Sequence, residues 1–330
     1  MTVLVTGGAG YIGSHTVRQL RVFDHDVVVL DNLDTGNASA VLDAQLIVGD
    51  IADEALVSRI CAEHHVTSVI HFAAHKNVGE SMASPSKYWH NNVDGTVRLI
   101  DAVLASGVHN FVFSSSCSVY GTPQSVPVNE SAPIHPESVY AETKAMMERI
   151  LGWYEVTRRL RSVSLRYFNA AGASLDNAIG EDWSHSANLI PLVMKAGLGQ
   201  GPPIRVFGSD YPTLDGTGVR DYIHVEDLAD AHVKALDYLE AGGPTVCLNV
   251  GTGVGTSVLD IVRATERIGD CTVPLEMSPR RDGDPVSVYA DPTLVHDVLH
   301  WTPQHDLDTI IGTAWRWHST HLDGLQGTTA

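Results

Sequence analysis

The stretch TVLVTGGAGYIGSH, residues 2–15, decides the fold, because it joins a short apolar strand to a glycine-rich turn and a helical pattern. Gly7, Gly10 and Gly13 have the spacing GxxGxxG. Glycines so spaced permit a tight turn and let the backbone approach a pyrophosphate, and the helix that follows presents its free amide groups to phosphate. The alternative, a turn kept only for packing, is disfavoured by this position after the first strand. The motif therefore predicts a dinucleotide-binding site.

The next apolar strand ends at Asp31, in the sequence VVVLDN. In this type of site an acidic residue at the end of the second strand accepts hydrogen bonds from a ribose diol. A carboxylate also repels the 2′-phosphate of NADP. Asp31 therefore favours NAD as the cofactor.

Short apolar runs alternate with helical patterns through the first half of the chain. Strands are expected at residues 2–6, 26–30, 44–48, 67–71, 110–115 and 161–166, and two long helices at 85–106 and 138–158. Several of the strands are apolar without alternation, as expected for strands that are covered on both faces. This pattern predicts an α/β fold with a doubly wound, Rossmann-type parallel sheet.

The second half is less regular, because glycine and proline are frequent from about residue 170, and we expect many loops there. Helical patterns return at 225–240 and near 257–268. We expect an NAD-binding domain over residues 1–168, with 220–240 packing back onto it. A smaller, mixed substrate domain is expected over 169–330.

The composition excludes several classes of protein. A formal net charge of −18 makes the chain a poor candidate for binding nucleic acid or an anionic membrane, although a few arginines can still bind a small anion. No run of about 18 apolar residues is present, and the first residues lack the basic leader of a signal peptide. We therefore expect a cytoplasmic protein.

Cysteine and histidine patterns give no sign of a metal centre. Cys61, Cys117, Cys247 and Cys271 are far apart and form no CxxC motif, and the seventeen histidines form no HExxH motif. We expect neither a disulfide framework nor a metal site.

Two tyrosines follow a Ser-Val pair, but only one of them is a candidate base. Tyr140 has Lys144 four residues later, on the same face of a helix, whereas Tyr120 is followed by a proline-containing loop. A tyrosine with a pKa near 10 needs roughly 4 kcal/mol to be half ionised at pH 7. An ammonium group about 4 Å away supplies that order of energy at an effective dielectric constant near 20. We predict that Tyr140 is a base assisted by Lys144 and that Tyr120 is structural.

Taken together, these motifs resemble the extended short-chain dehydrogenase/reductase superfamily, and within it the UDP-glucose (UDP-galactose) 4-epimerase family. The resemblance covers nearly the whole chain, through TGGAGYIGSH, VIHFAAHKNVGES, FSSSCSVYG, YAETK, LRYFNAAGA, DYPTLDGTGVRDYIHVEDLADAH and RRDGDP. It implies reversible 4-epimerisation of UDP-galactose and UDP-glucose through a 4-keto sugar. Hydride would pass to and from tightly bound NAD. It also implies a homodimer formed by the helices expected at 85–106 and 138–158.

The resemblance also assigns residues. The family's catalytic residues fall on Tyr140, Lys144 and Ser116. The NAD-binding residues fall on Gly7, Gly10, Tyr11, Ile12, Gly13, Asp31, Asn32, Asp50, Ile51, Phe72, Ala73, Ala74, Lys76, Asn91, Ser114, Tyr140, Lys144 and Tyr167. The UDP-sugar residues fall on Ser116, Tyr140, Asn169, Asn188, Leu189, Phe207, Arg220, Tyr222, Arg281 and Asp284. Two arginines among them would clamp a diphosphate in an otherwise acidic protein.

Several alternatives stay open on this scaffold. Nucleotide-sugar dehydratases carry an Asp-Glu pair before VYG, but this chain has Cys117 and Ser118 there, and neither can replace a carboxyl acid/base pair. In this family, the size of the side chain at the position of Val288 sets the space for a 2-acetamido group. The small valine favours an epimerase of UDP-N-acetylhexosamines, and a UDP-uronate epimerase is a related alternative. A net oxidoreductase and a non-catalytic NAD-binding regulator are the remaining alternatives.

Overall fold

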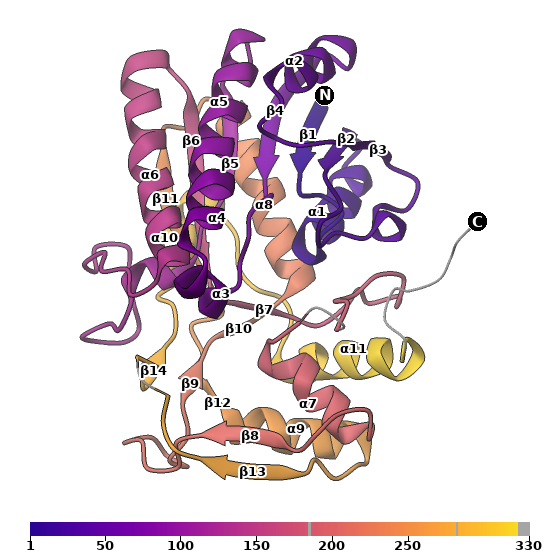
Figure 1. Cartoon of the computed structure of the whole chain (residues 1–330), viewed down its shortest axis with the longest axis vertical. Coiled ribbons are helices and arrows are strands. Elements are labelled where there is room, and N and C mark those ends of the chain that lie inside the picture. Colours follow the sequence, from indigo (N-terminus) through magenta and orange to yellow (C-terminus); the bar gives the residue numbers. More distant parts are fainter. Residues whose placement is uncertain (184–185, 282, 323–330) are drawn as a thin grey trace.

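A seven-stranded parallel sheet forms the centre of the larger part of the molecule, in the order β11-β6-β5-β4-β1-β2-β3 (Figure 1). The computed structural model describes residues 1–183, 186–281 and 283–322. The strands are β1 (Thr2–Thr6), β2 (Asp26–Asp31), β3 (Gln45–Val48), β4 (Val66–His71), β5 (Asn110–Ser114), β6 (Arg161–Tyr167) and β11 (Val246–Val250). The predicted α/β fold with a doubly wound parallel sheet is confirmed.

Helices cover both faces of this sheet (Figure 1). The first face carries α1 (Tyr11–Val22), α8 (Val225–Glu240) and α10 (Thr293–Leu299), and the second carries α2 (Glu54–Glu63), α5 (Thr96–Ala105) and α6 (Val139–Arg158). Strand β1 shows why its sequence lacks alternation: Val3 and Val5 pack on the first face and Leu4 on the second. All three side chains are fully buried, as expected for a strand that is covered on both faces.

Segments from the second half of the chain complete this sheet. Helix α8 packs against α1, and β11 pairs in parallel with β6 through Val246↔Val163 to Val250↔Tyr167. The part built around the sheet therefore uses residues far beyond 168.

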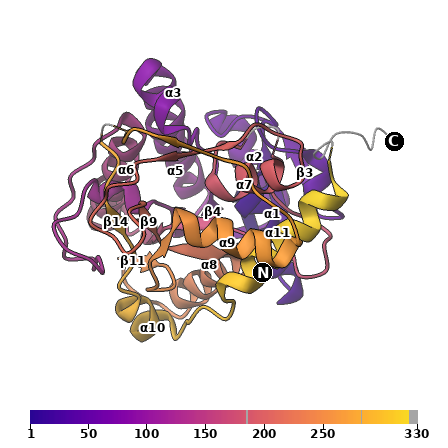
Figure 2. The same cartoon turned by 90° about the horizontal axis from the view of Figure 1, so that it is seen from below.

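The smaller part of the molecule lies below the carboxyl edge of the sheet. Figure 2 shows its helices α7 (Leu189–Gly197), α9 (Val258–Gly269) and α11 (Leu307–Thr320) together, and they share one apolar core. Its strands are β7 (Asn169–Ala171), β8 (Ile204–Phe207), β9 (Val219–Arg220), β10 (Tyr222–His224), β12 (Thr256–Ser257), β13 (Leu275–Ser278) and β14 (Ser287–Val288). They form a β10-β7 pair, a β12-β9-β14 sheet and a β13-β8 pair. The glycine- and proline-rich stretch that we interpreted as loop thus contains a strand, β8.

The long helix predicted at 85–106 is interrupted. It consists of α4 (Pro85–Tyr88), a π-helical stretch at Trp89–Gly95 and then α5. Helix α3 (Val78–Ala83) precedes it, whereas the helix predicted at 138–158 is continuous as α6. Within the described ranges, no helix combines the length and the apolar content that crossing a membrane requires.

Candidate active site

Tyr140 and Lys144 lie together in the first turns of α6. Ser138 caps the helix with its side chain, and the backbone amide of Tyr140 donates to the Ser81 hydroxyl at 3.2 Å. The Lys144 ammonium donates to the carbonyl oxygen of Ser114, at the end of β5, at 2.7 Å. It lies 5.9 Å from the centre of the Tyr140 ring. Both side chains are buried, 8% and 3% exposed, and the i, i+4 spacing brings them to one face as predicted.

Ser116 joins this pair from the loop after β5. Its hydroxyl acts on the Tyr140 side chain by lowering the pKa of that phenol, and it accepts two hydrogen bonds from Ser118, from the backbone amide at 3.2 Å and the hydroxyl at 2.9 Å. Ser114 donates through its hydroxyl to that of Tyr167 at 3.2 Å. The structure therefore brings the three predicted catalytic residues together at the carboxyl edge of the sheet, where ligands bind in this type of fold.

The protonation of the pair is dominated by burial. Burial raises the pKa of Tyr140 well above its usual value, Tyr167 adds to this, and the Ser116 hydroxyl opposes it. Burial also lowers the pKa of Lys144 to about 7, against the opposing effect of the Glu148 carboxylate. A lysine with that pKa is only about half charged near pH 7, so it supplies only part of the field that was expected to activate Tyr140.

Tyr120 belongs to a separate buried network behind the site. Its hydroxyl donates to Asn249 Oδ1 at 2.7 Å and accepts from Arg166 at 2.8 Å. Arg166 in turn forms a buried ion pair with Glu148 at 2.7 Å. These contacts agree with the structural interpretation of Tyr120. The Arg166–Glu148 pair was not found from the sequence, because its members come from a strand and a helix with no shared motif.

At two positions of the turn after β1, any side chain would clash with the backbone of the protein, so glycine is required. Gly7 has a φ of +72°, and a Cβ there would lie 2.5 Å from the backbone nitrogen of Ala73. A Cβ at Gly13 would lie 2.3 Å from the carbonyl oxygen of Gly7, whereas one at Gly10 would come no closer than 3.3 Å to that atom. Gly10 precedes α1 without a side-chain cap, so the amide end of that helix suits an anion.

Asp31 is tied to the same turn. Its carboxylate, 7% exposed, accepts the backbone amides of Ala9 and Leu33, each at 2.9 Å. A carboxylate has about four lone-pair sites, so two remain for hydroxyl groups of a ligand. The acid thus holds the glycine turn in place and can still accept hydrogen bonds from a ribose.

The other residues assigned to the adenosine end differ in their surroundings. Asn32 and Asp50 are exposed and accept backbone amides of their own turns, at 3.0 and 2.8 Å. Ile51 is 6% exposed and packs in the core beneath α2 and α5, so a cofactor contact there would involve its backbone.

The loop after β4 is fixed by an asparagine that sequence reasoning missed. Asn92 Oδ1 accepts the backbone amide of His75 at 2.9 Å, and its Nδ2 donates to the His75 carbonyl at 3.0 Å and to Thr143 at 3.3 Å. The predicted residue Asn91 donates to Asn92 Oδ1 at 2.9 Å and is itself half-buried. The doubled asparagine was the available signal, and the π-helical stretch decides which of the two points inward.

That loop carries most of the nicotinamide-side assignments. The backbone amides of Phe72 and Ala73 donate to the carbonyl of Thr6 at 2.8 and 3.1 Å, which holds the loop against the end of β1. Ala74 is half-buried, and Lys76 is exposed.

Apart from Ser116 and Tyr140, the residues assigned to the UDP-sugar belong to segments of the smaller part. Arg220 makes an ion pair with Asp284, and the Arg281 guanidinium lies 3.7 Å from the centre of the Phe207 ring. The neighbouring ring of Tyr222 is 8% exposed. The predicted arginines therefore come from two separate segments, β9 and the loop before β14.

Asp221 is a second residue that sequence reasoning missed. It is fully buried between Arg220 and Tyr222, and its carboxylate accepts from the Thr252 amide at 2.9 Å, the Thr252 hydroxyl at 2.6 Å and the Ala290 amide at 3.1 Å. These bonds tie the arginine strand to the loop after β11 and to the end of β14. The available signal was an acidic residue directly between two residues assigned to the substrate, in VRDYIHV.

The two assigned asparagines are also held by protein contacts. Asn169 donates to the carbonyl of Asp221 at 2.9 Å, and Asn188, just before Leu189 at the start of α7, donates to Glu181 at 3.0 Å.

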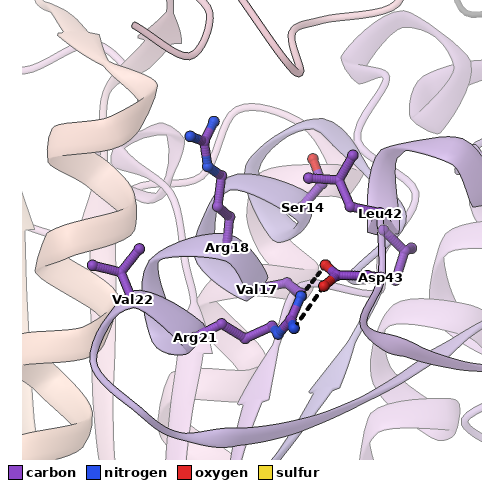
Figure 3. Close-up of a pocket in the computed structure, with 8 residues that line it drawn as sticks. Ser14, Val17, Arg18, Arg21, Val22, Leu42 and Asp43 are labelled. Atoms are coloured by element: carbon purple, nitrogen blue, oxygen red, sulfur yellow. Dashed lines mark hydrogen bonds and ion pairs between the residues drawn. The ribbon is translucent and has the colours of Figure 1, made fainter. Parts of the chain in front are cut away.

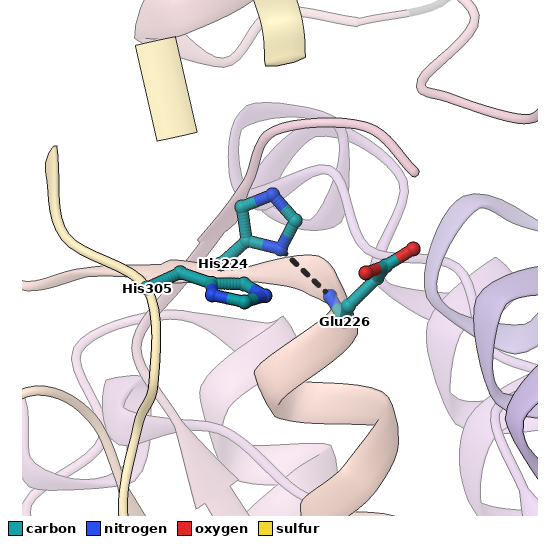
Figure 4. A group of neighbouring side chains, drawn as sticks. All are labelled: His224, Glu226 and His305. Atoms are coloured by element: carbon teal, nitrogen blue, oxygen red, sulfur yellow. Dashed lines mark hydrogen bonds between the residues drawn. The ribbon is translucent and has the colours of Figure 1, made fainter. Parts of the chain in front are cut away.

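His224, Glu226 and His305 form a group with the residue types of a metal site (Figure 4). The Nδ1 of His224 accepts the backbone amide of Glu226 at 3.1 Å, and its Nε2 lies 3.1 Å from the Thr313 hydroxyl. One oxygen of the Glu226 carboxylate and one nitrogen of each ring lie within 4.8 Å of one another. Because both nitrogens of His224 already have partners at the amino end of α8, where a cation is disfavoured, this geometry does not support a metal ion.

A pocket of about 270 Å³ lies on the outer side of α1, and none of the assigned site residues lines it (Figure 3). Arg21 reaches across it to an ion pair with Asp43, and Arg18 pairs with Asp176. Both arginines are thus neutralised, and the pocket offers no evident anion site.

Comparisons with known proteins identify the family of this chain. The model of the NAD dependent epimerase/dehydratase family matches residues 3–251. The UDP-glucose 4-epimerase of Rhizobium leguminosarum bv. trifolii is 47% identical over 318 residues, which cover 96% of this chain and 97% of that protein. The structure of UDP-glucose-4-epimerase from Stenotrophomonas maltophila with bound NAD and formylated UDP-arabinopyranose has a TM-score of 0.95 and 40% identity, covering 98% and 99% of the two chains. The UDP-Glc/GlcNAc 4-epimerase of Campylobacter jejuni has a TM-score of 0.85 and 36% identity, covering 97% and 99%.

Proposed function

This chain belongs to the NAD dependent epimerase/dehydratase family, and from that premise we propose that it interconverts UDP-glucose and UDP-galactose by inverting carbon 4 of the sugar. The observation that carries this proposal is the convergence of Ser116, Tyr140 and Lys144 at the carboxyl edge of a sheet that also carries the glycine turn. Cys117 and Ser118 occupy the positions where a dehydratase has its acids, which favours epimerisation over loss of water.

NAD fits the residues around the glycine turn. The uncapped amide end of α1 suits a pyrophosphate, and the Asp31 carboxylate keeps lone pairs for a ribose diol. When bound, NAD supplies the reversible hydride acceptor that oxidation at carbon 4 requires. We propose that the assigned cofactor residues from Gly7 to Tyr167 hold it, and that the part built around the central sheet is the cofactor domain.

Tyr140 is proposed to take the proton of the 4-hydroxyl and to return it when the sugar is reduced on its other face. The Ser116 hydroxyl, which acts on the pKa of that tyrosine, is proposed to share the proton with the substrate. Because burial raises the pKa of Tyr140, ionisation needs positive charge close by, and protonated Lys144 supplies part of it. The lysine is held in place by the Ser114 carbonyl.

The smaller part is proposed to bind the UDP-sugar. Arg220 and Arg281 provide two guanidinium groups, which bind the oxygens of a diphosphate in pairs. The buried Asp221 fixes the strand that carries the first of them. The two parts then form a cofactor domain and a UDP-sugar domain that meet at Tyr140.

The test is turnover by purified protein without added cofactor. We expect UDP-galactose to give UDP-glucose, because an epimerase has no net redox change and its NAD stays bound. The products are separated by anion-exchange chromatography, and cofactor content is read from absorbance after denaturation. Absence of turnover with and without added NAD would contradict the proposal, and steady release of NADH would indicate a net oxidoreductase instead.

Val288 favours a second substrate class. It is 6% exposed and packs with Phe168, Ala290 and Cys117, beside Arg220 in the paired strands β14 and β9. The relative from Campylobacter jejuni is described as a UDP-Glc/GlcNAc 4-epimerase. We propose that this chain also accepts UDP-N-acetylhexosamines, because a small side chain leaves space beside the sugar.

Replacing Val288 by tyrosine is expected to lower kcat/KM for UDP-N-acetylgalactosamine by at least about tenfold relative to UDP-galactose, since the larger ring fills that space. Val288→Ala is the matched control and should keep both activities. Both sugars are measured with the same chromatographic assay. If the unchanged protein does not turn over the N-acetylated sugar, the proposal of a second substrate class is wrong.

A homodimer is proposed from the outer surface of α6. Trp153 and Val156 are 69% and 74% exposed there, and neighbouring large apolar side chains of this kind mark interaction surfaces. Helix α5 runs beside α6, so the pair can form a four-helix interface with a second copy (Figure 1). Light scattering should give the mass of two chains for the unchanged protein and of one chain for Trp153→Glu. Val22→Glu, at an equally exposed apolar residue on α1, should leave the mass unchanged.

We also propose a cytoplasmic location, which the four free thiols suit.

A further inference from the structure

Glu181 is a buried carboxyl group that the proposed mechanism does not use. It is 5% exposed, and burial raises its pKa. Its carbonyl oxygen accepts the indole N–H of Trp317 at 3.0 Å, and Gly180 lies under that indole so closely that a Cβ would be 2.5 Å from the ring. The backbone of Glu181 is therefore fixed from the α11 side, so its carboxylate has a defined position.

The carboxylate holds a side chain assigned to the substrate. Asn188 Nδ2 donates to Glu181 Oε1 at 3.0 Å, and the backbone amide of Asn188 donates to the Ser186 hydroxyl at 3.2 Å. The Ser186 hydroxyl also lowers the pKa of the Glu181 carboxyl. Asn188 is the residue before α7, where an asparagine side chain normally caps the helix. Here its side chain makes no such cap and donates to Glu181 instead.

Charged and polar groups of the cofactor side face the same carboxylate. The Lys76 ammonium lowers the pKa of Glu181 against the effect of burial, and Glu181 adds to the burial that raises the pKa of Tyr11. Tyr11 begins α1, directly after the glycine turn, and Lys76 lies in the loop after β4. Glu181 thus interacts electrostatically with residues assigned to the cofactor and is hydrogen-bonded to one assigned to the UDP-sugar.

We propose that Glu181 is a positioning residue that orients the Asn188 amide for the UDP-sugar. With one N–H of the amide held by the carboxylate, the other N–H and the amide oxygen keep a fixed direction for the ligand. This inference rests on the proposed function, because it assumes that Asn188 contacts a UDP-sugar.

The test compares Glu181→Ala, Glu181→Gln, Asn188→Ala and the double variant Glu181→Ala/Asn188→Ala. Glu181→Ala should raise KM for UDP-galactose about tenfold, with kcat within about twofold and bound NAD per chain unchanged, since the loss of one hydrogen bond to a charged group is of that size. Glu181→Gln keeps an oxygen acceptor and should restore KM to within about threefold. The double variant should match Asn188→Ala alone, because residues that act through one another are not additive.

Additive effects on KM, or a loss of kcat and NAD together, would overturn the inference, because they indicate a role that does not pass through Asn188. Should Glu181→Ala fail to fold, Glu181→Asp keeps the charge but withdraws the carboxylate by one methylene, and it should raise KM in the same way. The affinity for UDP, measured by calorimetry, separates the two proposals. Equal UDP affinity in the unchanged and variant proteins contradicts the role of Glu181, whereas absence of UDP-galactose turnover in the unchanged protein contradicts the proposed function itself.

Discussion

Tyr140→Phe is expected to lower kcat for UDP-galactose by about 10³-fold or more, while NAD stays bound to the protein. The phenyl ring fills the same space in the first turn of α6, but it can neither accept nor return the proton of the 4-hydroxyl. Proton transfer by a positioned side chain contributes about 10² to 10⁴ in rate. The measurement is single-substrate kinetics together with the cofactor content of the purified variant.

Tyr120→Phe is the matched control, since Tyr120 also follows a Ser-Val pair and is also buried. Its hydroxyl bonds to Asn249 and Arg166, so its loss should cost about 1–3 kcal/mol of unfolding free energy and lower the Tm. The kcat of the folded variant should stay within about threefold. If Tyr140→Phe keeps full activity, or if Tyr120→Phe loses as much kcat, the assignment of the base is wrong.

Gly13→Ala should abolish cofactor retention and lower the unfolding free energy by about 3 kcal/mol or more. The added Cβ would lie 2.3 Å from the carbonyl oxygen of Gly7 and 2.9 Å from the Cα of Gly8. Both neighbours are backbone atoms of the turn, so the overlap cannot be relieved by a change of rotamer. Thermal unfolding and the absorbance of bound cofactor measure the two effects.

Two further glycines provide controls for that result. Gly152→Ala on α6 meets nothing within 4 Å and should leave cofactor content unchanged while stabilising the helix by up to about 1 kcal/mol. Gly10→Ala has only the 3.3 Å contact with Gly7 and should fold, yet lose cofactor, because its Cβ blocks the approach of the backbone to a pyrophosphate. A Gly13→Ala variant with normal Tm and cofactor content would contradict this account of the turn.

Local patterns were sufficient for the strands of the first half and for α6 and α8. Strands at Thr2–Thr6 and Asp26–Asp31, for example, show their burial directly as uninterrupted apolar runs. Local patterns were not sufficient for the strand Val246–Val250. Its partner β6 is distant in sequence, and Asn249 within Val246–Val250 breaks the apolar pattern. The π-helical stretch at Trp89–Gly95 was missed for a different reason: its apolar spacing is that of an ordinary helix.

The candidate site shows the same division. Tyr140 and Lys144 could be recognised because the i, i+4 spacing carries their chemistry within one turn of helix. Asn92, Asp221 and Glu181 could not, because each acts through contacts with segments that are distant in sequence or outside any motif. The pKa of Tyr140 also required the structure, since burial depends on the whole fold.

The late strand β11 has a consequence for how this protein is made. A ribosome must release residue 250 before the sheet gains its last strand, and α8, which covers one face, emerges only shortly before. Until then the nascent chain has β6 as an open edge, with Val163 and Leu165 uncovered, although both are fully buried in the finished fold. Expression of residues 1–168 alone would leave that edge permanently open and prone to aggregation, so the cofactor half cannot be obtained by simple truncation.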